Sequence, residues 1–131
     1  ALIMAVFEIN TPPSRRAANG AISVSVEWSP SFAADWEGRL HRAQTMLDQE
    51  ILRRMEPYVP FRTGTLAHSP IQASDIGSGL LIYNTPYAAR QYYDTAESRP
   101  YDALRGAHWA ERMKADCLPQ LVAFARKAVT L

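Results

Sequence analysis

The feature that most constrains this chain is a long apolar stripe in its first half. Large apolar residues recur at spacings of three and four along residues 32–51: Phe32, Trp36, Leu40, Ala43, Leu47 and Ile51. This spacing places them on one face of a helix of about 25 residues. Ser29 and Pro30 fit its N-cap and first helical position, and Pro57 and Pro60 end it. Charged residues, Asp48 among them, are expected mostly on the other faces.

A second helix is predicted at the far end of the chain, over residues 108–129. Its inward candidates are Trp109, Met113, Leu118 or Leu121, Phe124, Ala125 and Val129. Pro119 falls inside this run, where it either kinks the helix or begins a second one.

Two regions have strand patterns. Residues 21–28 alternate apolar Ile22, Val24, Val26 and Trp28 with polar residues, which predicts a half-buried strand. Residues 65–74 and 80–84 are predicted to form a β-hairpin with its tip at residues 77–79, and Pro70 restricts the first strand to an edge or a bulge. Thr85 is expected to cap a short helix that starts at Pro86.

Residues 1–20 have the composition of an arm. Pro12 and Pro13 favour extended backbone, while Arg15, Arg16 and an Asn-Gly pair add charge and a turn. Such an arm is flexible or is ordered by a partner, and flexibility is expected for a lone chain. We therefore predict a single domain over residues 21–131. Residues 1–7 are apolar but lack the basic start of a secretory signal.

Charge and cysteine content narrow the function classes. Fourteen Lys and Arg against thirteen Asp and Glu leave a net charge of +1, which argues against an electrostatic nucleic-acid binder. The single cysteine, Cys117, excludes an intramolecular disulfide and any Cys-pair zinc or redox motif. No run reaches the ~20 apolar residues that span a bilayer.

Residues that could carry chemistry are few. His108 and Glu111 have a spacing that can place two metal ligands on one helix face, and His68 is a third candidate. A small metal-dependent hydrolase or nuclease of a mobile element is therefore an alternative function. A solvated helix surface is the favoured interpretation of the pair, because the remaining histidines lie on unrelated segments. We predict no catalytic residue, no metal ligand and no cofactor.

Tyrosines and arginines gather in residues 83–105. Both residue types are enriched at protein interfaces, because a ring or a guanidinium can be desolvated and still hydrogen-bonded. Tyr83 and Tyr87 fit equally well as rings that cap the core. The predicted interface residues are Arg15, Arg16, Arg90, Tyr92, Tyr93, Arg99, Tyr101 and Arg105. The same arginines could instead serve a nucleic-acid accessory module, which the missing basic excess disfavours.

Three ordered segments carry a resemblance to a known family. Residues 57–69 contain a proline–threonine–glycine–x–leucine–x–x–serine pattern, residues 83–93 contain Pro86 and Tyr87, and residues 108–116 contain Trp109. Together they resemble the minor capsid proteins of long-tailed bacteriophages and prophages, relatives of the head–tail joining or tail completion proteins. The resemblance runs from about residue 24 to residue 129.

The resemblance implies an α+β fold, with a long N-terminal helix and a C-terminal helix packed on a small antiparallel sheet that contains a β-hairpin. It implies a non-enzymatic role in the virion neck, after a cytoplasmic stage in the host. It also implies that copies form a ring, often of six, between a head connector or stopper protein and a tail terminator or tube protein. The family motif residues are expected to determine the fold rather than make contacts: Pro60, Thr63, Gly64, Leu66, Pro86, Tyr87 and Trp109.

Overall fold

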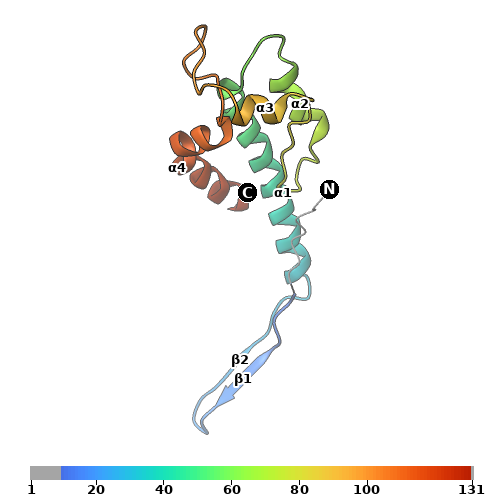
Figure 1. Ribbon diagram of the computed structural model, residues 1–131. Helices are drawn as coiled ribbons and strands as arrows, with labels where there is room; N and C mark the ends of the chain where they lie inside the picture. Colours follow the sequence, from blue (N-terminus) through green and yellow to red (C-terminus); the bar gives the residue numbers. More distant parts are fainter. Residues whose placement is uncertain (1–9, 131) are drawn as a thin grey trace.

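The computed structural model describes residues 10–130, so the apolar residues 1–7 lie outside it. A helical body formed by residues 32–130 carries a projecting hairpin formed by residues 15–26 (Figure 1). The elements in chain order are β1 (Arg15–Ala18), β2 (Ser23–Val26), α1 (Phe32–Met55), the 3-10 helix η1 (Glu56–Tyr58), α2 (Thr65–Ala73), α3 (Ala88–Tyr93) and α4 (Trp109–Thr130). The α+β class, with long first and last helices and a small antiparallel sheet, is confirmed.

The first long helix, α1, is confirmed at 24 residues. It begins two residues later than the sequence suggests, because the N-cap is Ser31 and not Ser29. The Ser31 hydroxyl donates to Asp35 Oδ2 at 3.0 Å instead of accepting from the backbone. Arginines in the last turn stabilise the negative end of the helix dipole, and η1 follows at once.

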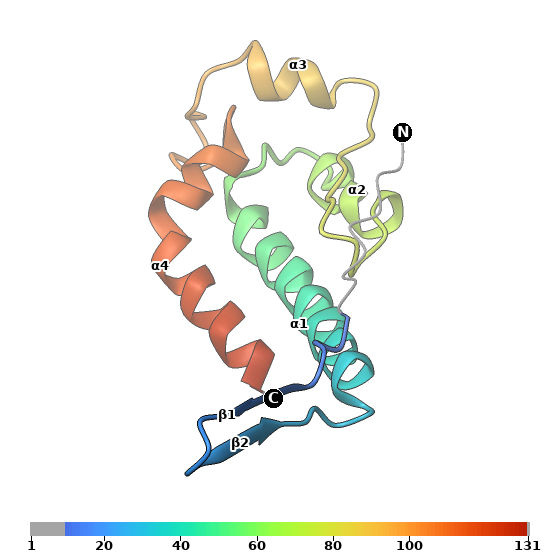
Figure 2. The ribbon, with the colours of Figure 1, turned by 90° about the horizontal axis from the view of Figure 1, so that it is seen from below.

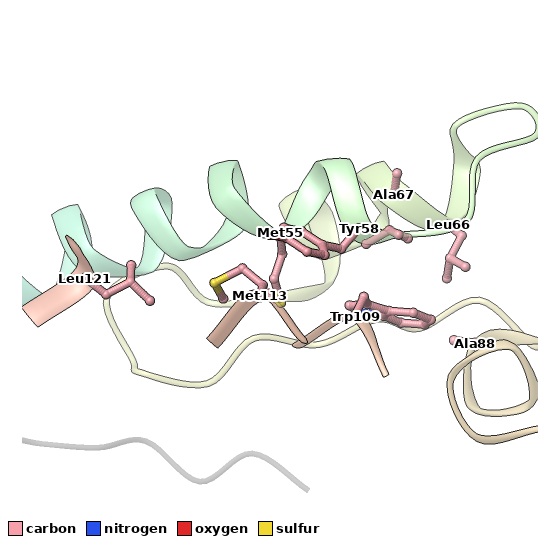
Figure 3. Packing of buried hydrophobic residues seen from close by; sticks show 9 residues of the cluster. Met55, Tyr58, Leu66, Ala67, Ala88, Trp109, Met113 and Leu121 are labelled. Carbon is pink, nitrogen blue, oxygen red and sulfur yellow. The ribbon is translucent and has the colours of Figure 1, made fainter. Parts of the chain in front are cut away.

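The core lies where α1 and α4 pack side by side in opposite directions (Figure 2). Trp109 and Met113 of α4 face Met55 and Tyr58, and α2 closes one end of the cluster (Figure 3). The Tyr83 ring meets the Trp109 ring edge-on at 5.3 Å between centroids. The sheet takes no part in this core.

Helix α4 is one continuous element, so Pro119 does not begin a second helix. Pro119 and Ala115 are both exposed, and the carbonyl left without a helical donor by the proline is therefore on the solvent side. Leu121 is buried and Leu118 is exposed, which settles the alternative between them.

The hairpin predicted over residues 65–74 and 80–84 is wrong: the first segment is α2. Pro70 lies inside this helix and cannot donate to the Leu66 carbonyl. The Ser69 hydroxyl donates to that same carbonyl at 3.0 Å and replaces the missing bond. Gly64 precedes the helix with a φ of +85°, in the left-handed region that favours glycine.

The loop at residues 77–79 is not a hairpin tip, because its backbone is hydrogen-bonded to α1. Asp48 Oδ2 accepts from the backbone N–H groups of Gly77 at 2.8 Å and Gly79 at 3.1 Å. Gln44 donates to the other carboxylate oxygen at 2.7 Å. Asp48 is only 1% exposed, so its predicted place on a solvent face is wrong. A Cβ at Gly77 would lie 2.7 Å from Thr45 Oγ1, which keeps this approach close.

Residues 80–84 return along the body without forming a strand. The Ile82 N–H donates to Ser74 Oγ at 2.7 Å, so a side chain replaces the predicted ladder. The predicted cap of the next helix is also wrong: α3 begins at Ala88 with Tyr87 as N-cap. Thr85 Oγ1 is buried without a hydrogen-bond partner, and only the Thr85 carbonyl takes part, accepting from Ala88 N–H at 3.0 Å.

The strand predicted over residues 21–28 is present as β2, but its predicted half-burial is wrong because both strands of the hairpin are exposed. It pairs antiparallel with β1, which lies within the predicted arm, so the hairpin crosses the predicted boundary at residue 20. Asn19 Oδ1 accepts from the N–H groups of Ala21 and Ile22, and Gly20 has a φ of +92°. The alternation of apolar and polar residues therefore predicted the strand correctly, but it does not show whether another element covers the apolar face of that strand.

Candidate functional site

Residues 94–107, which contain Arg99, Tyr101 and Arg105 of the predicted interface set, are held against the helical body. Arg105 donates through Nη1 to the carbonyls of Glu56 at 2.9 Å and Val59 at 2.7 Å. Its guanidinium also lies over the Phe61 ring, 5.0 Å from the centroid. These internal bonds give Arg105 a place in the fold, with little of its side chain left for a partner.

Arg112 supports the same loop and was missed by sequence reasoning. Its Nε donates to the Ala107 carbonyl at 2.8 Å and its Nη1 to the Leu104 carbonyl at 2.7 Å. The guanidinium lies over the Tyr58 ring at 5.5 Å. No local pattern distinguishes Arg112 from a solvated arginine in the first turn of a helix, so only the tertiary contacts reveal its role.

The other predicted interface residues of this region divide into two groups. Arg99 donates to Gln91 Oε1 at 3.0 Å, and the Tyr92 ring packs edge-on against Trp109 at 4.6 Å, so both take part in the fold. Burial raises the pKa of Tyr92. The exposed group comprises Arg90, Tyr93 and Tyr101.

The three segments that carry the family resemblance meet in one core cluster. Leu66 comes from the first segment, Ala88 from the second, and Trp109 and Met113 from the third. Tyr83 in the second segment is also packed against the cluster, and its burial raises the pKa of its hydroxyl. Of the motif residues, Gly64, Leu66 and Trp109 are buried, whereas Thr63, Pro86 and Tyr87 are exposed.

An apolar groove of about 690 Å³ opens between α1 and α4, bounded also by residues 79–83 and by α3. Leu47 and Ile51 of α1 form one wall, and Leu118 and Val122 of α4 form the other. Both α4 side chains are exposed although they line a carbon-rich surface. Lys114 is the one charged residue among the described lining residues. No pattern in the sequence predicted this groove.

The hairpin presents a second exposed apolar surface. Residues paired across an antiparallel ladder share a face, so Val24 lies beside Ala17, and Val26 beside Arg15. Ile22 and Trp28 extend the same face by alternation. The exposed fractions are 67% for Ile22, 58% for Val24 and 46% for Val26. We call Ala17, Ile22, Val24, Val26 and Trp28 the hairpin apolar face.

The opposite face of the hairpin is polar, with Arg16 beside Ser25. Both predicted arginines, Arg15 and Arg16, are exposed, one on each face. At the base of the hairpin the Trp28 ring packs against Phe32 of α1, 4.9 Å between centroids. The hairpin is thus amphipathic, and its apolar face continues onto the start of α1.

The residues considered for metal chemistry are not gathered into a ligand set. His108 Nδ1 lies 3.1 Å from Glu97 Oε1, while Glu111 is exposed on α4. The His68 ring, on α2, contacts Phe61. Within residues 10–130 there is no group of three His, Cys, Asp or Glu side chains placed to hold a metal ion.

None of the helices among residues 10–130 is both long enough and apolar enough to cross a membrane. No curated protein and no solved structure matches the chain. The family model described as minor capsid protein matches residues 22–129, which include β2 and the whole helical body to within one residue of its end. The chain therefore belongs to the minor capsid protein family, a family of structural proteins of the phage virion.

Proposed function

We propose that this protein is a subunit of the phage neck. Copies form a ring that completes the head-proximal end of the tail and joins it to the head connector. Membership of the minor capsid protein family supports a structural role in the virion. The resemblance of residues 57–69, 83–93 and 108–116 to head–tail joining proteins supports the more specific place.

The observation that carries the proposal is the hairpin apolar face. Large apolar side chains stand on a projecting element, where water surrounds them in the lone subunit. Contiguous exposed patches of a few hundred Å² on a folded protein mark contacts with other macromolecules. A subunit that assembles with others needs such an exposed surface in addition to a folded body with its own buried core.

The proposed role requires no bond to be made or broken. A neck subunit has to hold a fixed shape and present surfaces to its neighbours, and the ties made by Arg105, Arg112 and Asp48 supply the rigidity. Arg90, Tyr93 and Tyr101 provide exposed side chains of the kinds found at interfaces. Neighbours of the ring would be a head connector or stopper protein and a tail terminator or tube protein.

Deletion of the gene in a producing phage tests the proposal. We expect DNA-filled heads and separate tails by electron microscopy, and joined particles when the wild-type chain is supplied from a plasmid. Infectious particles in normal number after the deletion would refute it.

Variants of the residues considered for metal chemistry provide the matched control. Glu111→Ala and His68→Ala change exposed side chains and should restore joining as well as the wild-type chain does. Loss of joining with both variants, in folded protein, would favour the metal-dependent alternative.

A further inference from the structure

We propose that the neck ring is closed by hairpin exchange: the hairpin apolar face of one copy lies in the apolar groove of the next copy. This inference rests on the proposed function, since it names the two surfaces that join neighbouring subunits. The occupant of the groove is thus a second copy of this chain, and the contact is repeated from subunit to subunit.

The hairpin needs a partner to be stable. Each strand has four residues, and both strands are exposed along their whole length. An isolated two-stranded hairpin is marginal in water unless its apolar face packs against another element. Ile22, Val24 and Val26 present such a face with nothing from the described body covering it. Docking on a neighbour supplies the missing layer.

The groove offers the matching surface. Its walls are apolar side chains from α1 and α4, and its floor is the closed core that contains Trp109 and Met113. Leu118 and Val122 stay exposed at its edge in the lone subunit. Covering apolar surface of this kind contributes roughly 25 cal/mol per Å² removed from water.

The two surfaces lie at different places on the subunit, which is the condition for a ring. The hairpin projects beyond the first residue of α1, whereas the groove begins near Leu47 (Figure 1). Fifteen residues of helix separate Phe32 from Leu47, a distance of about 22 Å along the axis. Contacts between two different patches of identical subunits run head to tail, and they give a ring when the rotation closes.

Disulfide cross-linking of the full chain tests the exchange. In a Cys117→Ala background, we would introduce V24C on the hairpin and L118C at the groove, and oxidise the concentrated protein. We expect a ladder of linked oligomers on a non-reducing gel. Mixing V24C chains with L118C chains should give linked dimers and nothing larger. The matched control pair S25C and L118C, with its hairpin cysteine on the polar face, should cross-link at most one tenth as fast.

Three outcomes would overturn the inference. A cross-link within single chains only would show that the hairpin folds back on its own groove. Cross-linking that requires removal of residues 1–9 would make those residues the occupant. Equal rates for V24C and S25C would show random collision. Circular dichroism of each variant confirms that the body is folded in every case.

The deletion phage separates this inference from the proposed function. If deletion leaves heads and tails apart but a Val24→Asp chain restores joining, the exchange is wrong and the neck role stands. If deletion has no effect on joining, the neck role is wrong whatever cross-links form in the purified protein.

Discussion

The helical body and the hairpin use the same kind of pattern with opposite results. In the body, the apolar stripes of α1 and α4 meet each other, and Met55, Trp109 and Met113 are buried between them. In the hairpin, the alternation of β2 is equally regular, yet Val24 and Val26 stay in water. Periodicity therefore tells which face of an element is apolar, and a tertiary contact decides whether that face is covered within the chain.

The side-chain hydrogen bonds of the two regions also differ, because those of the body join distant segments and those of the hairpin are local. In the body, Tyr58 donates to Asp116 at 2.7 Å across 58 residues of sequence. Asp48 joins α1 to the loop at residues 77–79, 29 and 31 residues away. In the hairpin, the side-chain bonds are local to its turn, where Asn19 accepts from residues two and three positions on. The body is closed by contacts within one chain, and the hairpin is not.

The largest contrast is expected between two tryptophans. Trp109 is 2% exposed in the body and Trp28 is 39% exposed at the hairpin base. Trp109→Ala should lower the free energy of unfolding by about 3–5 kcal/mol, because it leaves a cavity in the core. Trp28→Ala should cost about 1 kcal/mol, as expected for a partly exposed ring. Urea denaturation measures both, and equal losses would break the distinction between the regions.

The buried carboxylate of Asp48 comes next. Asp48→Ala leaves the Gly77 and Gly79 N–H groups without an acceptor and should lower the free energy of unfolding by about 2–3 kcal/mol. Asp75→Ala in the same loop changes an exposed side chain and should stay within about 0.5 kcal/mol. A loss as small as that of the control would show that the loop does not depend on this tether.

The Tyr58 hydroxyl gives a smaller effect that depends on pH. Its hydrogen bond to Asp116, together with burial, raises the pKa of Tyr58 to about 12. The folded state therefore favours the protonated hydroxyl, and this stability is present below the unfolded pKa of 10. It is lost as the pH rises from 10 toward 12.

Tyr58→Phe removes the hydrogen bond and should cost about 1 kcal/mol at pH 7. Thermal unfolding at several pH values should show the wild type losing this advantage over the variant above pH 10. A constant difference across that range would contradict the role given to the Asp116 contact.

The smallest effect on stability is expected in the hairpin. Val24→Asp changes an exposed residue, so the unfolding free energy of the isolated chain should change by less than about 0.5 kcal/mol. Sedimentation of the concentrated protein should nevertheless show loss of self-association, which Ser25→Asp on the polar face leaves intact. Loss of fold with Val24→Asp would place the hairpin in the body.

The elements with many repeats of one period were predictable from the sequence. Several turns of apolar residues at helical spacing define α1, and the alternation at residues 22–28 defines β2. The short α2 was not predictable, because Pro70 favours a strand edge until the Ser69 bond to the Leu66 carbonyl is seen. The presence of Ser69 in the sequence does not show that its hydroxyl replaces the backbone donor that Pro70 lacks.

The candidate surfaces were only partly predictable. The abundance of tyrosine and arginine predicted an interface in residues 83–105. In the structure, however, Arg105 and Arg99 donate hydrogen bonds to backbone and side-chain atoms of the same chain. Asp48 resembles any charged residue on a helix, since its partners are distant in sequence. The groove forms where α1, α3 and α4 meet. Each of these helices has an ordinary sequence pattern, and no pattern in one of them indicates that the three together line a groove.

Hydrogen exchange tests most directly whether the body is complete by itself and the hairpin is completed by a neighbour. In the dilute chain, amides at the α1–α4 core should exchange slowly and those of residues 16–26 quickly, since local opening free energies follow burial and packing. In virions, where we propose that the ring is assembled, the hairpin amides should become protected. Hairpin amides as slow as the core in the dilute chain, or still fast in the virion, would contradict the account.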